Sequence, residues 1–170
     1  NWPALSKQFG TEYVKTVKQH ADQSPYFVDK MTGNFFYLGA ISLALPNAKI
    51  VHCRRDPLET CVSIYKRFFA AGIEFSYDMN ELGEYYKLYE GLMEHWYQVL
   101  GDRVLNVDYE SVVNNTELET RRLLDFCALE FEPSCLNFHQ TKRMVRTSSA
   151  AQVTQHIYKS SLKVSDKFGH

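Results

Sequence analysis

The sequence predicts an α/β protein in which helices flank a parallel sheet. Short apolar runs that suit buried strands alternate with longer segments in which apolar residues recur at helical spacing. Strand, helix, strand and helix follow one another closely, which is typical of βαβ units and therefore of parallel strands. At 170 residues the chain suits one domain with a substantial core, and we expect that domain to span residues 1–170.

The first half of the chain carries five predicted elements. Phe9, Tyr13 and Val17 recur at helical spacing with lysines between them, and this indicates an amphipathic helix. The five elements are a helix over 6–20, a buried-type strand over 26–28, a helix over 35–45, a strand over 49–53 and a helix over 57–70.

The second half of the chain begins with a polar loop and ends in a stretch without apolar periodicity. Between them we expect a long helix over 82–100, a strand over 103–107, an amphipathic helix over 115–127 and a short helix over 133–139. From residue 140 to 155 the side chains are polar and small. A loop of this length inside a compact domain is usually functional or disordered.

Composition excludes several classes of function. The formal net charge is −1, so nothing indicates bulk attraction to nucleic acid or to an anionic membrane. No run of 18 apolar residues predicts a membrane span. The four cysteines form no Cys-x-x-Cys pair and have no histidines at zinc-binding spacing, so we expect no metal. Unpaired cysteines and the lack of a signal peptide favour a reducing, cytoplasmic location.

The most informative stretch follows the strand predicted over 49–53. That strand ends in two arginines, the second of which is Arg55, and an Asp56-Pro57 pair comes next. Proline suits the first turn of a helix, and aspartate can cap the exposed N–H groups there. The predicted helix then carries Ser63 and, one turn later on the same side, Arg67. A guanidinium, a hydroxyl and a helix N-terminus together predict a site for a compact dianion.

This stretch resembles the 3′-phosphate-binding element of sulfotransferases that use 3′-phosphoadenosine 5′-phosphosulfate (PAPS). In that family an arginine at a strand end and a serine eight residues later hold the 3′-phosphate, and Arg55 and Ser63 have this spacing. Four further stretches resemble family segments in the same order, namely 28–39, 85–96, 107–113 and 146–158. The resemblance is to a bacterial branch that is often fused behind tetratricopeptide repeats and is distantly related to tyrosylprotein sulfotransferases.

The resemblance implies a fold and a reaction. The fold is a P-loop-NTPase-like parallel sheet flanked by helices, here without its first strand and without the Gly-rich loop that cradles the 5′-phosphosulfate. The chain would then be the C-terminal part of a larger protein and inactive alone, with its general base upstream of residue 1. The reaction is transfer of a sulfuryl group from PAPS to an acceptor hydroxyl or amine. A peptide tyrosine, a carbohydrate and a small molecule all remain open as acceptors.

The resemblance also assigns residues to roles. It makes Lys30 and Ser149 catalytic, places Tyr109 near the adenine and lets Lys159 or Lys163 supply a further phosphate contact. Each has a structural alternative. Lys30 and Arg67 would otherwise be solvated surface cations, Tyr109 a core residue and Ser149 part of a simple turn.

Two other functions remain open from the sequence. The chain could be a non-catalytic nucleotide-binding remnant or interaction module. It could also be a nucleotide kinase-like P-loop protein, although it contains no Gly-x-x-x-x-Gly-Lys-Ser/Thr motif.

Overall fold

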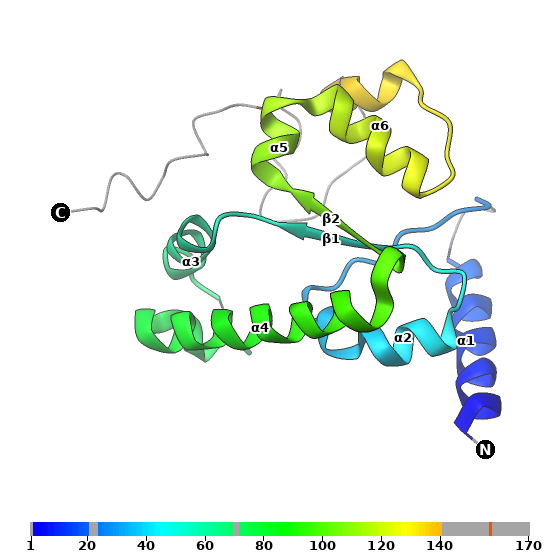
Figure 1. Cartoon of the computed structure of the whole chain (residues 1–170), viewed down its shortest axis with the longest axis horizontal. Coiled ribbons are helices and arrows are strands. Elements are labelled where there is room, and N and C mark those ends of the chain that lie inside the picture. Colours follow the sequence, from blue (N-terminus) through cyan, green and yellow to red (C-terminus); the bar gives the residue numbers. More distant parts are fainter. Residues whose placement is uncertain (1, 21–23, 70–71, 141–156, 158–170) are drawn as a thin grey trace. The chain divides into compact units, whose positions relative to one another are not determined.

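The structure, a computed structural model, describes residues 2–20, 24–69, 72–140 and 157 (Figure 1). Most of the described chain is helical. The α-helices are α1 (Trp2–Lys18), α2 (Leu38–Ala44), α3 (Pro57–Tyr65), α4 (Met79–Leu100), α5 (Tyr109–Asn114) and α6 (Thr116–Phe126). Short 3-10 helices are η1 (Thr32–Tyr37), η2 (Glu74–Tyr77), η3 (Gly101–Arg103) and η4 (Pro133–Gln140).

Two strands, β1 (Ile50–Arg54) and β2 (Val104–Asp108), form a small parallel sheet. The predicted α/β class with parallel strands is therefore confirmed. Two residues separate the end of β1 from the start of α3, and α5 begins directly after β2. The carboxyl ends of parallel strands lie at the same edge of a sheet, so the first residues after both strands come together there.

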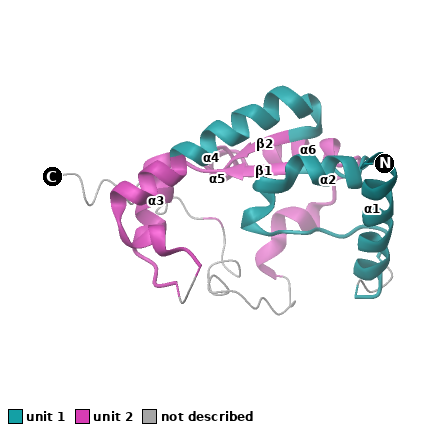
Figure 2. Ribbon diagram, turned by 90° about the horizontal axis from the view of Figure 1, so that it is seen from below, with its two compact units in different colours: residues 1–50, 87–104 teal, residues 51–86, 105–170 magenta. Residues whose placement is uncertain are grey.

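The described chain divides into two compact units, which Figure 2 shows in different colours. Unit 1 comprises residues 1–50 and 87–104. Its core is a cluster of four buried side chains, Leu38, Ile50, Met93 and Val104, with aromatic residues of η1 and α4 packed around it.

Helix α1 packs closely against α2 within unit 1. The contact is closest at Gly10, where a methyl group in place of the α-hydrogen would lie 1.9 Å from the carbonyl oxygen of Ala44. The guanidinium of Arg103 then holds the end of α2 by donating to the carbonyl oxygens of Ser42, Leu45 and Pro46. The carbonyl of Ser42 belongs to the last turn of α2, where carbonyl groups have no partner within the helix.

Unit 2 comprises residues 51–86 and 105–170, so it contains the edge of the sheet where both strands end. Leu82, near the start of α4, is fully buried, and the rings of Phe75 and Tyr85 stack with their centroids 3.9 Å apart. The guanidinium of Arg122 on α6 donates to the backbone carbonyl of Asn106 on β2 at 2.9 Å. This bond ties α6 to the second strand.

Two details of the prediction are wrong. Residues 26–28 form no strand, and Val28 is 92% exposed. A strand needs a neighbour for its N–H and C=O groups, and the ladder found in the described residues joins only β1 and β2. The helix predicted over 57–70 ends at Tyr65. Beyond it, the N–H of Phe69 donates to the hydroxyl of Tyr77, which holds the chain away from a helical path.

Among the described residues, no helix has the length and apolar character that crossing a membrane requires. The same part of the chain holds no group of three or more histidine, cysteine or acidic side chains that could bind a metal ion.

Candidate functional site

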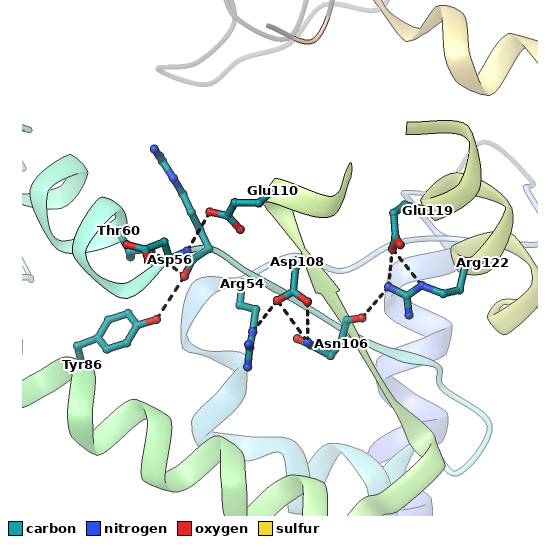
Figure 3. Close-up of polar contacts among 10 residues, drawn as sticks. Arg54, Asp56, Thr60, Tyr86, Asn106, Asp108, Glu110, Glu119 and Arg122 are labelled. Atoms are coloured by element: carbon teal, nitrogen blue, oxygen red, sulfur yellow. Dashed lines mark hydrogen bonds and ion pairs between the residues drawn. The ribbon is translucent and has the colours of Figure 1, made fainter. Parts of the chain in front are cut away.

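Three consecutive residues at the end of β1 contact three consecutive residues at the end of β2. Arg54 donates from Nε to a carboxylate oxygen of Asp108 at 2.7 Å, and the backbone N–H of Asp56 donates to the carboxylate of Glu110 at 3.0 Å (Figure 3). Between these two contacts, the guanidinium carbon of Arg55 lies 5.4 Å from the centroid of the Tyr109 ring. The two strand ends therefore form one junction, and Arg55 and Tyr109 are its central pair.

Arg55 is held by a second contact on α3. Its Nη2 lies 2.8 Å from Oε2 of Glu59, four residues later. The Arg55 side chain keeps 23% of its surface exposed, whereas the Glu59 side chain keeps 4%. A guanidinium has five N–H donors in a planar fork, so one bond to a carboxylate does not exhaust them.

The start of α3 is as the sequence predicts. Asp56 is the N-cap residue and accepts from the N–H of Glu59 at 2.9 Å, and Pro57 occupies the first turn. The carbonyl of Arg55 also lies within 3.5 Å of two hydroxyl groups, those of Thr60 and Tyr86 (Figure 3). The backbone at Arg55 is thus held by hydrogen bonds to its own carbonyl oxygen and to the N–H of the next residue, Asp56.

Glu59 is not among the site residues that the sequence predicts. Its carboxylate, the capping carboxylate of Asp56 and that of Glu110 all lie at the first turn of α3. The sequence predicts that this helix end attracts an anion. The negative charge of the three carboxylates makes it less favourable for an anion. The spacing of four residues from Arg55 was the available signal, because residues so placed can pair along a helix.

The structure places Ser63 and Arg67 differently from each other. Ser63 is half-buried in the last turns of α3, one turn beyond Glu59, so the two share a face of that helix. Arg67 is exposed and follows the end of α3, so it does not share that face as a helical residue.

Lys30 belongs to unit 1 and is exposed, in a segment that is neither helix nor strand. The preceding residue anchors this segment. The carboxylate of Asp29 accepts from the hydroxyl of Tyr13 on α1 and from the side-chain amide of Asn34. Lys30 is therefore positioned by the anchored Asp29 beside it. The strand that the sequence predicts just before Lys30 is not formed.

Two predicted site residues, Ser149 and Lys163, lie outside the described residues.

His52 is the histidine closest in sequence to the junction. Burial lowers the pKa of His52, the Arg54 guanidinium lowers it further, and the Asp108 carboxylate opposes both. Burial and Arg54 thus favour the neutral form of the His52 ring. The positive charge at the end of β1 comes from arginines 54 and 55.

A family model described as "Sulfotransferase family" matches residues 1–133. An uncharacterized protein of Aquifex aeolicus is 34% identical to this chain over an alignment of 173 positions. The alignment covers 95% of this chain. The chain spans 23% of the length of that relative.

Proposed function

This chain belongs to the sulfotransferase family, and from that premise we propose that it transfers a sulfuryl group from PAPS to an acceptor hydroxyl or amine. The proposal includes the branch to which the sequence is similar, in which tetratricopeptide repeats precede the catalytic domain. The proposed acceptor is a peptide tyrosine, a carbohydrate or a small molecule, the three classes that the sequence leaves open.

The observation that carries this proposal is the contact between Arg55 and Tyr109. The resemblance assigns the first to the 3′-phosphate and the second to the adenine of the same nucleotide. A nucleotide can bind both residues only if they lie near each other, and they are neighbours at one sheet edge although 54 positions separate them in sequence. Ligands of parallel sheets bind at this edge, beyond the carboxyl ends of the strands.

We assign the 3′-phosphate to Arg55 and Ser63. Arginine is suited to this role because its planar fork can donate two parallel hydrogen bonds to a phosphate. Ser63 adds a hydroxyl donor on the face of α3 that also carries Glu59. Arg67 and Lys163 are assigned to the outer phosphate contacts, where a flexible cation is sufficient.

The transfer step makes one bond and breaks another. The acceptor oxygen or nitrogen bonds to sulfur while the bond between sulfur and the 5′-phosphate oxygen breaks. The departing phosphate oxygen keeps the electron pair, and the acceptor proton passes to a general base. Lys30 and Ser149 are proposed to stabilise the charge that develops on the departing oxygen and the sulfuryl group, since fixed donors at such positions are a principal source of catalysis.

Calorimetric titration of two nucleotides tests the assignment of Arg55. A charge-assisted phosphate contact contributes roughly 1.5–3 kcal/mol, so Arg55→Ala should weaken binding of 3′-phosphoadenosine 5′-phosphate about ten- to hundredfold. ADP, which has no 3′-phosphate, should bind the variant as it binds the parent protein. Equal losses for both nucleotides would contradict the assignment.

Two further variants control the titration. Arg55→Lys keeps a cation for the buried Glu59 carboxylate but loses the planar fork, so it should show the same selective loss in a stable protein. Arg121→Ala removes a guanidinium that pairs with Glu117 on the exposed face of α6, and it should change neither affinity. Conversion of PAPS to 3′-phosphoadenosine 5′-phosphate in the presence of each acceptor class then tests the reaction itself.

A further inference from the structure

We propose that Glu59 is the positioning residue for Arg55. It would hold the guanidinium in the orientation in which Arg55 binds the 3′-phosphate of the nucleotide. This inference rests on the proposed function for its ligand, but the contact between the two side chains can be tested without any ligand. Neither the family match nor the uncharacterized relative assigns a role to Glu59.

The first argument is the burial of the Glu59 carboxylate. Only 4% of this side chain is exposed, in contrast to the acidic partners Asp108 and Glu117 of two other ion pairs, whose side chains are 39% and 56% exposed. Burying a carboxylate costs free energy unless it is paired and hydrogen-bonded. Glu59 therefore keeps its charge at this place only together with a cation, and that cation is Arg55 at 2.8 Å.

The second argument is the rigidity of the backbone on which the carboxylate stands. The N–H of Glu59 is held by the Asp56 cap, and Asp56 is itself bonded to Glu110 on the neighbouring element. The position of the Glu59 carboxylate is thus determined by the start of α3 and by the junction with β2. An acceptor fixed in this way can fix the long and otherwise mobile side chain of an arginine.

The third argument is the geometry around the guanidinium. Glu59 contacts one nitrogen of Arg55, and the Tyr109 ring lies near the guanidinium carbon at 5.4 Å. A carboxylate at one edge and a ring nearby restrict both the direction and the rotation of the planar group. Because residues of the protein itself set this orientation, less conformational entropy is lost when the phosphate binds.

A matched pair of nucleotides isolates this effect. We define the 3′-phosphate increment as the affinity for 3′-phosphoadenosine 5′-phosphate divided by the affinity for adenosine 5′-monophosphate, measured on the chain as its gene encodes it. Glu59→Ala should reduce this increment about tenfold, because Arg55 loses its anchor. Glu59→Gln, which keeps an acceptor oxygen at the same distance, should recover most of it.

Two outcomes of the titration would overturn the inference. An unchanged increment in Glu59→Ala, even with a lower stability of the protein, would show that Glu59 serves the packing of α3 alone. A larger increment would show that the carboxylate competes with the phosphate for Arg55 and does not position it.

A measurement without nucleotide separates this inference from the proposed function. Phenylglyoxal modifies exposed, mobile guanidinium groups, and the modified peptides can be quantified by mass spectrometry. In Glu59→Ala, Arg55 should react several times faster than in the parent protein, while Arg54, which pairs with Asp108 at the same junction, should react at its original rate. Unchanged reactivity of Arg55, or equal acceleration of both arginines, would refute positioning. If the parent protein fails to prefer the 3′-phosphorylated nucleotide, the proposed function fails and this measurement still decides the role of Glu59.

Discussion

The guanidinium carbon of Arg55 lies 5.4 Å from the centroid of the Tyr109 ring, and the residues on either side of each make parallel contacts. Arg54 pairs with Asp108 and Asp56 pairs with Glu110, so three successive positions after one strand meet three successive positions after the other. Such a regular correspondence arises because the two strands are parallel neighbours that end at the same edge. The sequence motif around Arg55 and the one around Tyr109 therefore meet at one edge of the sheet.

The Tyr109 ring should contribute to nucleotide binding through its face and not through its hydroxyl group. Tyr109→Phe keeps the ring beside Arg55, so the affinity for 3′-phosphoadenosine 5′-phosphate should stay within about twofold. Tyr109→Ala removes the ring on which the adenine is proposed to stack, and base–aromatic stacking contributes about 1–3 kcal/mol, so the affinity should fall roughly five- to 150-fold. Calorimetry on both variants makes the comparison. A large loss in the phenylalanine variant would show that the hydroxyl group binds the nucleotide directly.

The two ion pairs at the end of β1 should differ in their effect on stability. Arg54 and Asp108 have half-exposed side chains, and pairs of this kind typically couple by about 0.2–1 kcal/mol in a double-mutant cycle. Replacing Arg55 by alanine leaves the Glu59 carboxylate buried without its cation, which costs about 3–5 kcal/mol. Urea unfolding of Arg54→Ala and Arg55→Ala compares the two. Equal losses of unfolding free energy would mean that burial does not distinguish the pairs.

The sequence predicts the start of α3 correctly because capping is a local property. Asp56 and Pro57 lie next to the helix that they begin, and the N-cap bond spans only three residues. The end of the same helix depends on Tyr77, which binds the backbone of Phe69 from eight positions away. No local pattern shows that contact, and the predicted helix was therefore five residues too long.

In the candidate site, too, local features can be predicted from the sequence and contacts between distant residues cannot. The spacing of Arg55 and Ser63 follows from the chain itself, whereas the burial of Glu59 depends on what packs against α3. The strand predicted over 26–28 rested on three apolar residues in a row, but a strand exists only where a partner strand pairs with it. Lys30 was correspondingly placed at a strand end and is found beside an anchored aspartate instead.

The hydrogen bond from Tyr13 to Asp29 should make the protein sensitive to alkaline pH. This bond, with burial and the negative charge of Asp29 adding to it, raises the pKa of Tyr13 to about 12 from 10.0. The folded protein therefore holds this proton more tightly than the unfolded chain. The stabilisation is fully present below pH 10 and is lost as the pH rises from 10 toward 12.

The measurement compares the parent protein with Tyr13→Phe, which lacks the hydroxyl group. Unfolding free energy should fall more steeply between pH 10 and 12 in the parent protein than in the variant. The difference in ultraviolet absorbance between the two proteins should titrate with a pKa of about 12. Identical slopes and a difference spectrum that titrates near 10 would show that Asp29 does not hold Tyr13, and the segment carrying Lys30 would lose its anchor.

Three glycine-to-alanine substitutions in unit 1 should have opposite effects on stability. At Gly10 the new methyl group would lie 1.9 Å from the backbone oxygen of Ala44, and at Gly39 it would lie 2.8 Å from the Trp96 ring. Overpacking of this kind costs about 1–3 kcal/mol, and Gly10→Ala should lose more than Gly39→Ala because a backbone oxygen of α2 cannot move as a side chain can.

Gly91 on α4 is the matched control, because apart from its chain neighbours and the backbone of its own helix no atom lies within 4 Å of the position that its methyl group would take. Alanine is the better helix former by about 1 kcal/mol, so Gly91→Ala should raise the unfolding free energy. Urea unfolding of the three variants measures these changes. If Gly10→Ala were as stable as Gly91→Ala, α1 could not pack against α2 as closely as the structure places it.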